Sequence, residues 1–261
     1  MAAHTVIDRV AVLMYHRVAD DDDSRELAVP PATFRKQMHA LAKQGIQAIG
    51  LTEFLEWSQG GRTLSWPSVL ITFDDGYLDV YQQAAPVLQQ LGWPATIFLI
   101  SDLLGGSDRW RRGGYPLMSW PQARELAQAG FSLQSHSRSH VDLTTVDAAR
   151  LQQEIAGSKQ ALEDGLGLAV DTIAYPYGRH NARVIDCVRQ AGFRAGFSVQ
   201  SGFNRPNFDA YRYRRLDVYG SDSARRLLRK VELGTNDGSW QNKARFYAGR
   251  LAAKLGVAAN R

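Results

Sequence analysis

Short apolar runs recur along the chain and alternate with amphipathic segments. Six runs are rich in aliphatic, β-branched and aromatic residues, as the strands of a parallel sheet with both faces buried are. They cover residues 10–15, 69–73, 95–100, 131–134, 172–175 and 195–199. Between them, residues 33–44 and 146–162 place apolar side chains at helical spacing. The pattern therefore predicts strands and helices in alternation.

This alternation predicts an α/β protein, with a parallel sheet and outer helices arranged either as a barrel or as a doubly wound sheet. In both arrangements the ligand site gathers where the strands end. Polar residues that could act in catalysis or bind a metal stand at the ends of these runs. Asp74 and Asp75 follow the second run, His136 the fourth and Tyr177 the fifth, while His16 follows the first. We expect these side chains to meet.

Composition predicts one folded domain with a basic end. At 261 residues and 44% hydrophobic content, the chain can bury one sizeable core. The net charge of +5 is concentrated in residues 222–261, which hold nine basic and three acidic residues. We expect a catalytic domain over 1–221 and a basic helical extension over 222–261, with Lys243, Arg250 and Lys254 on one face. Docking on the domain is favoured over weak membrane-surface contact, and no nucleic-acid partner is expected.

Two features of the sequence indicate the cellular compartment. Cys187 is the single cysteine, which excludes an internal disulfide and a multi-cysteine zinc site. The first residues lack the charged and apolar regions of a secretory signal, and no segment reaches 18 apolar residues. We therefore expect a cytoplasmic protein, with membrane association left open and no oligomeric state predicted.

The doublet Asp74-Asp75 places two carboxylates side by side after an apolar run, which is costly unless a cation or a proton offsets their repulsion. Gly76 permits a sharp turn that would let both side chains reach one site. The competing interpretation is a helix N-cap followed by an acidic first turn. The doublet alone does not distinguish a functional site from a helix N-cap.

His136 and His140 are four residues apart, a spacing that places two imidazoles on one face of a helical turn and suits a metal. Two histidines and one aspartate would leave a position open for water or substrate, as catalytic sites do. Zinc, cobalt and nickel all accept such ligands, zinc being favoured. The alternative is a solvated helix face.

Three motifs in order narrow the interpretation: TFDDG at 72–76, SHSRSH at 135–140 and YPYG at 175–178. With them the chain resembles the polysaccharide deacetylase (NodB-homology) family of carbohydrate esterases over residues 10–220. The resemblance implies a distorted (β/α)7 barrel holding one divalent metal ion. It also implies that Asp75, His136 and His140 are the metal ligands and Asp74 the general base. Pro176, Tyr177 and Gly178 match the family's third motif, in which a backbone N–H holds the oxyanion.

The chain departs from the family pattern twice. Tyr175 stands where many members place an arginine that orients the base, and the YPYG form is similar to the subgroup acting on β-1,6-linked poly-N-acetylglucosamine. The C-terminal motif that carries the general acid is also missing, since residues 214–218 contain no histidine and none follows His180. In that subgroup a similar N-terminal YH motif supplies the acid, so His16 is the candidate here. The alternative for His16 is a core histidine bonded to the backbone.

The sequence thus favours a metal-dependent hydrolase that releases acetate from an N-acetylhexosamine-containing saccharide, whether polymeric, lipid-linked or a small glycoconjugate. A hydrolase of another amide, such as a formamide or a cyclic imide, and a saccharide-binding pseudoenzyme are the alternatives. Intact Asp74, Asp75, His136 and His140 argue against the pseudoenzyme. Trp110, Tyr115 and Trp120 could stack on sugar rings or equally fill the core.

Overall fold

The computed structural model describes residues 7–20, 27–110, 114–245 and 247. Its strands are β1 (Ala11–Tyr15), β2 (Gln47–Ala48), β3 (Ser68–Phe73), β4 (Thr96–Leu99), β5 (Ser132–Ser135), β6 (Thr172–Ala174), β7 (Ala195–Phe197) and β8 (Leu216–Asp217). Its α-helices are α1 (Pro31–Lys43), α2 (Leu51–Ser58), α3 (Ala85–Gln90), α4 (Trp120–Gln128), α5 (Ala148–Leu166), α6 (Ala182–Gln190) and α7 (Ala224–Leu233). Short helical turns are η1 (Val80–Ala84), η2 (Ser101–Leu103), η3 (Pro176–Gly178) and η4 (Ala210–Arg212).

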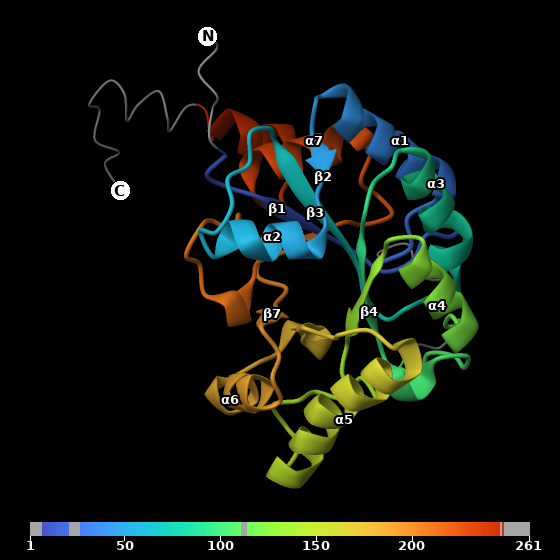
Figure 1. The fold of residues 1–261 in the computed structure, drawn as a ribbon. Helices are drawn as coiled ribbons and strands as arrows, with labels where there is room; N and C mark the ends of the chain where they lie inside the picture. Colours follow the sequence, from blue (N-terminus) through green and yellow to red (C-terminus); the bar gives the residue numbers. More distant parts are fainter. Residues whose placement is uncertain (1–6, 21–26, 111–113, 246, 248–261) are drawn as a thin grey trace.

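The paired strands form one parallel sheet in the order β7-β6-β5-β4-β3-β1-β8, with β2 beside β3. The segment leading into β8 connects the two ends of that order. Tyr213 exchanges backbone hydrogen bonds with Gly196 and Ser198 at β7, and Leu216 pairs with Leu13 of β1. The sheet therefore curls into a distorted barrel, with most helices outside it (Figure 1). The predicted (β/α)7 barrel is confirmed.

The barrel wall separates two apolar layers. Along β1, Ala11, Leu13 and Tyr15 belong to the larger cluster, together with side chains of the outer helices. Val12, and Val10 just before the strand, belong to a second cluster inside. The side chains of a strand point alternately to its two faces, so each strand contributes to both layers. All residues of β1 and β3 are buried, which explains why these strands appear in the sequence as continuous apolar runs.

The helices begin and end at residues suited to those positions. Asp147 caps α5 by accepting a hydrogen bond from the Arg150 N–H, and Gly167 ends the helix with a left-handed φ of 68°. Pro31 occupies the first turn of α1, where its missing N–H costs nothing. Both helices lie within a few residues of the ranges that the sequence predicts.

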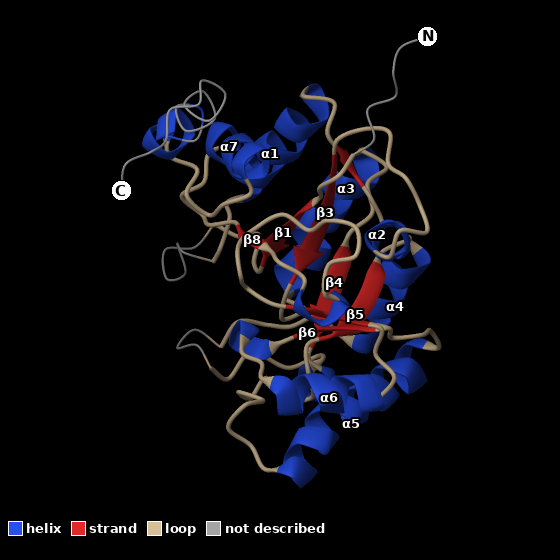
Figure 2. Cartoon of the chain, turned by 90° about the vertical axis from the view of Figure 1, so that its left-hand side faces the viewer, coloured by secondary structure: helices blue, strands red, loops and turns tan. Residues whose placement is uncertain are grey.

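The basic extension begins with α7, which packs against α1 (Figure 2). Ser223 caps the start of α7 and Gly234 ends it. Of the basic face that the sequence predicts, Lys243 forms an ion pair with Glu232, while Arg250 and Lys254 lie outside the described residues. Within the described ranges, no helix is both long and apolar enough to cross a bilayer.

Candidate active site

The predicted site residues stand at the carboxyl ends of neighbouring strands. Asp74 and Asp75 follow β3, His136 follows β5, and the turn Pro176–Gly178 follows β6. His16 follows β1, which pairs with β3. In a parallel sheet these ends meet at one edge, so residues far apart in sequence converge there.

The turn after β3 brings both carboxylates of the doublet into the site. Asp75 has a φ of 70° and Gly76 a φ of 74°, so two successive residues adopt the left-handed conformation. A Cβ at Gly76 would lie 2.7 Å from the Leu99 side chain, and glycine is therefore required there for space as well as for φ. Asp74 and Asp75 are both buried. A strained aspartate at this position indicates a functional constraint, because such conformations persist only where the surroundings hold them.

His136 and His140 also converge, but not on a helix. The prediction of a helical turn was wrong: these residues lie in a loop, in which Ser137 and His140 have φ values of 64° and 61°. The reversal of φ at these two positions turns the chain so that the imidazole rings lie 5.0 Å apart. The four-residue spacing is therefore compatible with a metal-binding pair without helical geometry.

Asp75, His136 and His140, together called the ligand cluster, present donor atoms to one point. Asp75 Oδ1 lies 3.3 Å from Nε2 of each histidine. Atoms at the corners of a tetrahedron whose centre is about 2.1 Å away lie about 3.4 Å from one another, which matches these spacings. Asp75 Oδ1 is buried and has no hydrogen-bond partner among the described residues. A buried carboxylate oxygen without a partner is costly, so the cluster fits a metal ion.

A backbone carbonyl determines which ring nitrogen of His136 is free to bind a metal ion. Its Nδ1 lies 2.8 Å from the carbonyl oxygen of Ala174, at the end of β6. Because a carbonyl only accepts, Nδ1 must carry a hydrogen, and the Nε2 lone pair of the neutral ring faces the cluster. This is the outer hydrogen bond that metal-bound histidines usually make.

The two histidines differ in pKa. Burial lowers the pKa of His140 to about 4, against the opposing pull of the Asp75 charge. Burial also acts to lower the pKa of His136, but the nearby charges of Asp74 and Asp75 outweigh it and raise that pKa above its usual value. Burial would raise the pKa of Asp75, yet its interactions with the two nearby histidines lower it. Asp75 is thus ionised and His140 neutral at neutral pH, as metal ligands must be.

Asp74 is held by Arg215, which sequence reasoning missed. Arg215 Nη1 and Nη2 donate to Asp74 Oδ1 and Oδ2 at 2.6 and 2.8 Å, and its Nε donates to the carbonyl of Ser198. Both side chains are buried. Burial would raise the pKa of Asp74, but the charge and hydrogen bonds of Arg215, with smaller contributions from His136 and His16, lower it. Asp74 is therefore an ionised carboxylate fixed beside the ligand cluster.

Arg215 takes the place of the arginine that the chain lacks at Tyr175. The Tyr175 hydroxyl donates to the carbonyl of Tyr211, and its ring stacks on His180, so it points away from Asp74. Arg215 stands directly before β8, in the segment that closes the barrel. The sequence signal was the basic pair Arg214-Arg215 before Leu216, and it did not indicate a partner.

The Pro176–Gly178 turn borders the cluster. Tyr177 has a φ of 58°, and its half-exposed ring centre lies 4.7 Å from that of His140. Gly178 has a φ of 68°, and a Cβ there would lie 2.3 Å from the Val199 side chain. The turn thus lies between Val199 and the cluster.

His16 is close enough to act electrostatically on the site. Its charge contributes to the pKa of both aspartates of the doublet and of Asp217. Asp217 lies on β8 beside β1, and burial raises its pKa despite the charges of Arg215 and His16. The position at the edge of the site agrees with the sequence prediction, and the role of His16 stays a prediction.

Of the three aromatic candidates, Trp110 reaches the site. Its ring stacks on His140 with centres 4.1 Å apart and planes inclined by 28°. Tyr115 lies beneath the guanidinium of Arg17, at 3.5 Å, whereas Trp120 packs so tightly on α5 that a Cβ at Gly165 would lie 2.2 Å from it. Trp110 therefore forms a wall of the site, and Trp120 fills space between helices.

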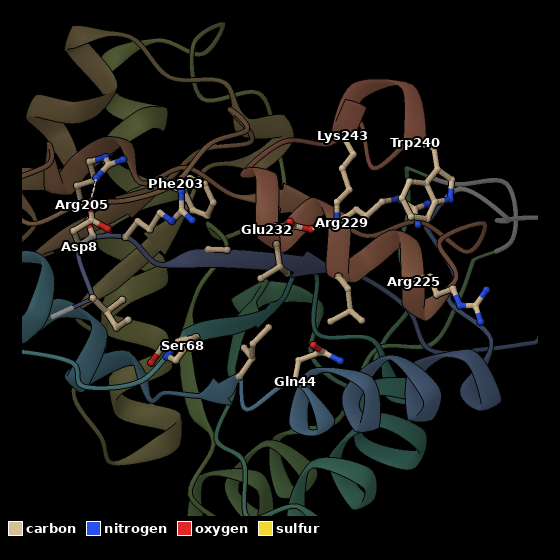
Figure 3. Close-up of a pocket in the computed structure, with 17 residues that line it drawn as sticks. Asp8, Gln44, Ser68, Phe203, Arg205, Arg225, Arg229, Glu232, Trp240 and Lys243 are labelled. Carbon is tan, nitrogen blue, oxygen red and sulfur yellow. Dashed lines mark hydrogen bonds and ion pairs between the residues drawn. The ribbon is translucent and has the colours of Figure 1, made fainter. Parts of the chain in front are cut away.

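A separate groove of about 1040 Å³ lies away from the ligand cluster. It is lined by Ala11 and Ser68 at the beginnings of β1 and β3, and by α7 residues that include Arg225 and Arg229 (Figure 3). The ligand cluster stands at the opposite ends of these strands. This basic groove is therefore not part of the candidate site.

Comparisons with known proteins find similar chains among deacetylases. A family model for polysaccharide deacetylases matches residues 61–196. YxkH of Bacillus subtilis, described as a polysaccharide deacetylase, is 30% identical over 80% of this chain and 71% of its own length. The poly-β-1,6-N-acetyl-D-glucosamine N-deacetylase of Staphylococcus aureus is 24% identical over 84% of this chain and 81% of its own length. The chain covers only 34% of the Escherichia coli protein of that name.

A solved structure shares both fold and sequence. IcaB from Ammonifex degensii superposes with a TM-score of 0.71 and 29% identity, over 81% of this chain and 92% of that one. The family match and the relatives together define the class of protein, a deacetylase enzyme on a parallel α/β barrel. The chain belongs to the polysaccharide deacetylase family.

Proposed function

We propose that the chain hydrolyses the acetamide of N-acetylglucosamine residues in a saccharide, releasing acetate, and that it depends on one divalent metal ion. The observation that carries this proposal is the buried Asp74–Arg215 pair beside the ligand cluster. Amide hydrolysis by water needs a base that stays ionised next to a group that activates the carbonyl. An arrangement with a fixed carboxylate and three convergent donors meets both needs.

The ligand cluster would hold the metal ion, which supplies Lewis acidity and lowers the pKa of a bound water. Two imidazoles and one carboxylate suit zinc, cobalt or nickel, and we propose zinc because it takes three protein ligands and one open position in hydrolytic sites. Trp110 stacked on His140 shields one side of the cluster from solvent.

Asp74 would act as the general base. Its Oδ2 lies 4.0 Å from His136 Nε2, so the carboxylate faces the cluster and can take a proton from the attacking water. Arg215 donates to both oxygens and leaves the remaining lone pairs of Asp74 available. The arginine therefore keeps the base ionised and fixes its direction.

Two further groups would complete the reaction. The water oxygen attacks the acetamide carbon, and the backbone N–H of Tyr177 would hold the oxygen that becomes negative. When the C–N bond breaks, the amine must gain a proton. We assign this proton to the His16 imidazole, because His16 lies at the end of β1, within electrostatic reach of the doublet.

The substrate is proposed from the relatives. The S. aureus relative is named for poly-β-1,6-N-acetyl-D-glucosamine, and it aligns over most of its own length. The half-exposed Tyr177 and the Trp110 wall offer aromatic faces on which a sugar ring could stack. We therefore propose a β-1,6-linked N-acetylglucosamine polymer as the preferred substrate.

Acetate release from β-1,6- and β-1,4-linked N-acetylglucosamine oligomers, with and without added zinc, tests the proposal. We expect release from the β-1,6 oligomer, its loss on chelation and its return with zinc. Asp74→Asn should retain bound metal and lose about 10²- to 10⁴-fold in rate, the usual contribution of a general base. An unchanged rate in this variant would remove Asp74 from its role, and release from formamides alone would overturn the substrate.

A further inference from the structure

The three residues 137–139, here called the histidine loop, connect the two histidines of the ligand cluster. Both Ser137 and His140 are held in the left-handed conformation, which L-residues adopt only when their surroundings impose it. The position of His140 Nε2 therefore depends on whatever holds this loop. It does not follow from local preference.

One side of the histidine loop is held by backbone groups. The N–H groups of Ser101 and Asp102, in η2, donate to the carbonyls of Ser137 and Arg138. Within the loop, the Ser137 hydroxyl accepts from the His140 N–H at 3.1 Å. These bonds satisfy the carbonyls of Ser137 and Arg138, and the N–H groups of Arg138 and Ser139 are directed toward α5.

Glu154 of α5 holds the other side. Its Oε2 accepts from the backbone N–H groups of Arg138 and Ser139 at 3.0 and 2.9 Å. Its Oε1 accepts from the Ser139 hydroxyl at 2.5 Å and lies 2.6 Å from an Arg150 nitrogen. The side chain of Glu154 is fully buried, so no exposed carboxylate oxygen remains for solvent.

The chemistry of these contacts requires a carboxylate. The two N–H groups and the guanidinium can only donate, and the Ser139 hydroxyl donates to Glu154 in this structure. Both terminal atoms of the side chain at position 154 must therefore accept hydrogen bonds. An amide of the same shape would turn an NH₂ group toward one pair of donors. Charge-assisted hydrogen bonds are also about twice as strong as neutral ones. The reaction scheme does not use Glu154. Arg150 of α5 also contacts the histidine loop, by donating to the Ser139 hydroxyl at 3.0 Å, but Glu154 is the α5 side chain that accepts from the loop N–H groups.

We propose that Glu154 is a positioning residue that sets the geometry of His140 and, through it, the metal affinity of the ligand cluster. The inference rests on the proposed function, because it takes the cluster to be a metal site. Glu154 itself contacts neither the cluster nor the substrate. It acts by holding the strained loop that ends at His140.

The test is the zinc affinity of chelator-stripped Glu154→Gln, measured by calorimetric titration. We expect the dissociation constant to rise about 10- to 100-fold, as when an outer partner of a metal ligand is lost. The matched control is Glu163→Gln. Glu163 lies on the same helix and its carboxylate also accepts from a backbone N–H, that of Val170, but it is away from the loop. This variant should bind zinc as the wild type does.

Thermal unfolding of the metal-free variants separates positioning from general stability. If Glu154→Gln and Glu163→Gln lose similar stability but only the first loses zinc affinity, the positioning role stands. Should Glu154→Gln fail to fold, Ser139→Ala removes one contact of the carboxylate and is expected to weaken zinc binding by a smaller factor. Zinc affinity within twofold of wild type in Ser139→Ala and in any folded Glu154→Gln overturns the role of Glu154. Full zinc affinity in His136→Ala would instead overturn the metal site itself.

Discussion

Arg215 and Asp74 form a bidentate ion pair in which both side chains are buried, although 141 positions separate them in the chain. Removing one partner of such a pair leaves an uncompensated charge in the interior. We expect Arg215→Met to lower the free energy of unfolding by about 3–5 kcal/mol, as breaking buried pairs usually does. Urea unfolding of the metal-free protein measures this.

The double variant Asp74→Asn/Arg215→Met is the control, because it removes both charges. Its unfolding free energy should recover part of the loss seen in Arg215→Met, since no ionised carboxylate is then left without a partner. Arg215→Lys keeps the positive charge but cannot form the bidentate hydrogen bond with Asp74. We expect this variant to fold and to release acetate more slowly. An Arg215→Met variant as stable as the wild type would contradict the pair's role.

The pattern of apolar runs predicted a parallel α/β sheet but left a barrel and a doubly wound sheet open, and only the resemblance to the family implied the barrel. The failures of the pattern have physical causes. Runs such as 69–73 are visible because β3 is buried on both faces. Strands β2 and β8 have two residues each, too few to show a period, so the closing segment that carries Arg215 was not predicted. The pairing of Arg215 with Asp74 is set by barrel closure, which no local pattern records. The helical turn at His136 was wrong because left-handed Ser137 and His140 produce the same convergence without a helix.

Metal uptake should release about one proton at pH 6. Burial lowers the pKa of His140 to about 4, so this ring is already neutral at that pH. His136 is different, because burial is outweighed by Asp74 and Asp75 and its pKa lies above the usual value. It is mostly protonated at pH 6, and a metal must displace that proton. Affinity therefore falls as pH decreases through the pKa of His136.

Calorimetry of zinc binding in buffers with different ionisation enthalpies counts the released protons. Asp74 is the leading cause that raises the pKa of His136, so Asp74→Asn should release fewer protons at the same pH. Release of two protons by the wild type would show that His140 is protonated as well. That outcome would contradict the assignment of His140 as the neutral ligand.

His16→Asn tests the proton donor. We expect acetate release from an N-acetylated oligosaccharide to fall about 10²- to 10⁴-fold, the range for loss of a general acid, with zinc affinity retained. The control is His39→Asn, which removes an exposed histidine on α1 away from the site. A second readout uses a substrate whose leaving group needs no protonation, such as an acetate ester of a phenol, which His16→Asn should hydrolyse nearly as fast as the wild type. Equal losses on both substrates would rule out proton donation.

The Gly178–Val199 contact provides a test of the proposed oxyanion turn. A Cβ at Gly178 would lie 2.3 Å from the Val199 side chain, and a φ of 68° adds about 1–2 kcal/mol of strain for an L-residue. Gly178→Ala should therefore displace the neighbouring N–H of Tyr177 and reduce the turnover number more than it changes KM, because the oxyanion forms only on the way to the product. Val199→Ala alone should change turnover little. In Gly178→Ala/Val199→Ala the two Val199 methyl groups, at 2.3 and 2.6 Å, are gone, whereas the Cβ at position 199, at 2.8 Å, and the strain in φ remain, so turnover should recover in part. If the double variant is no more active than Gly178→Ala, the loss does not arise from the clash with the Val199 methyl groups.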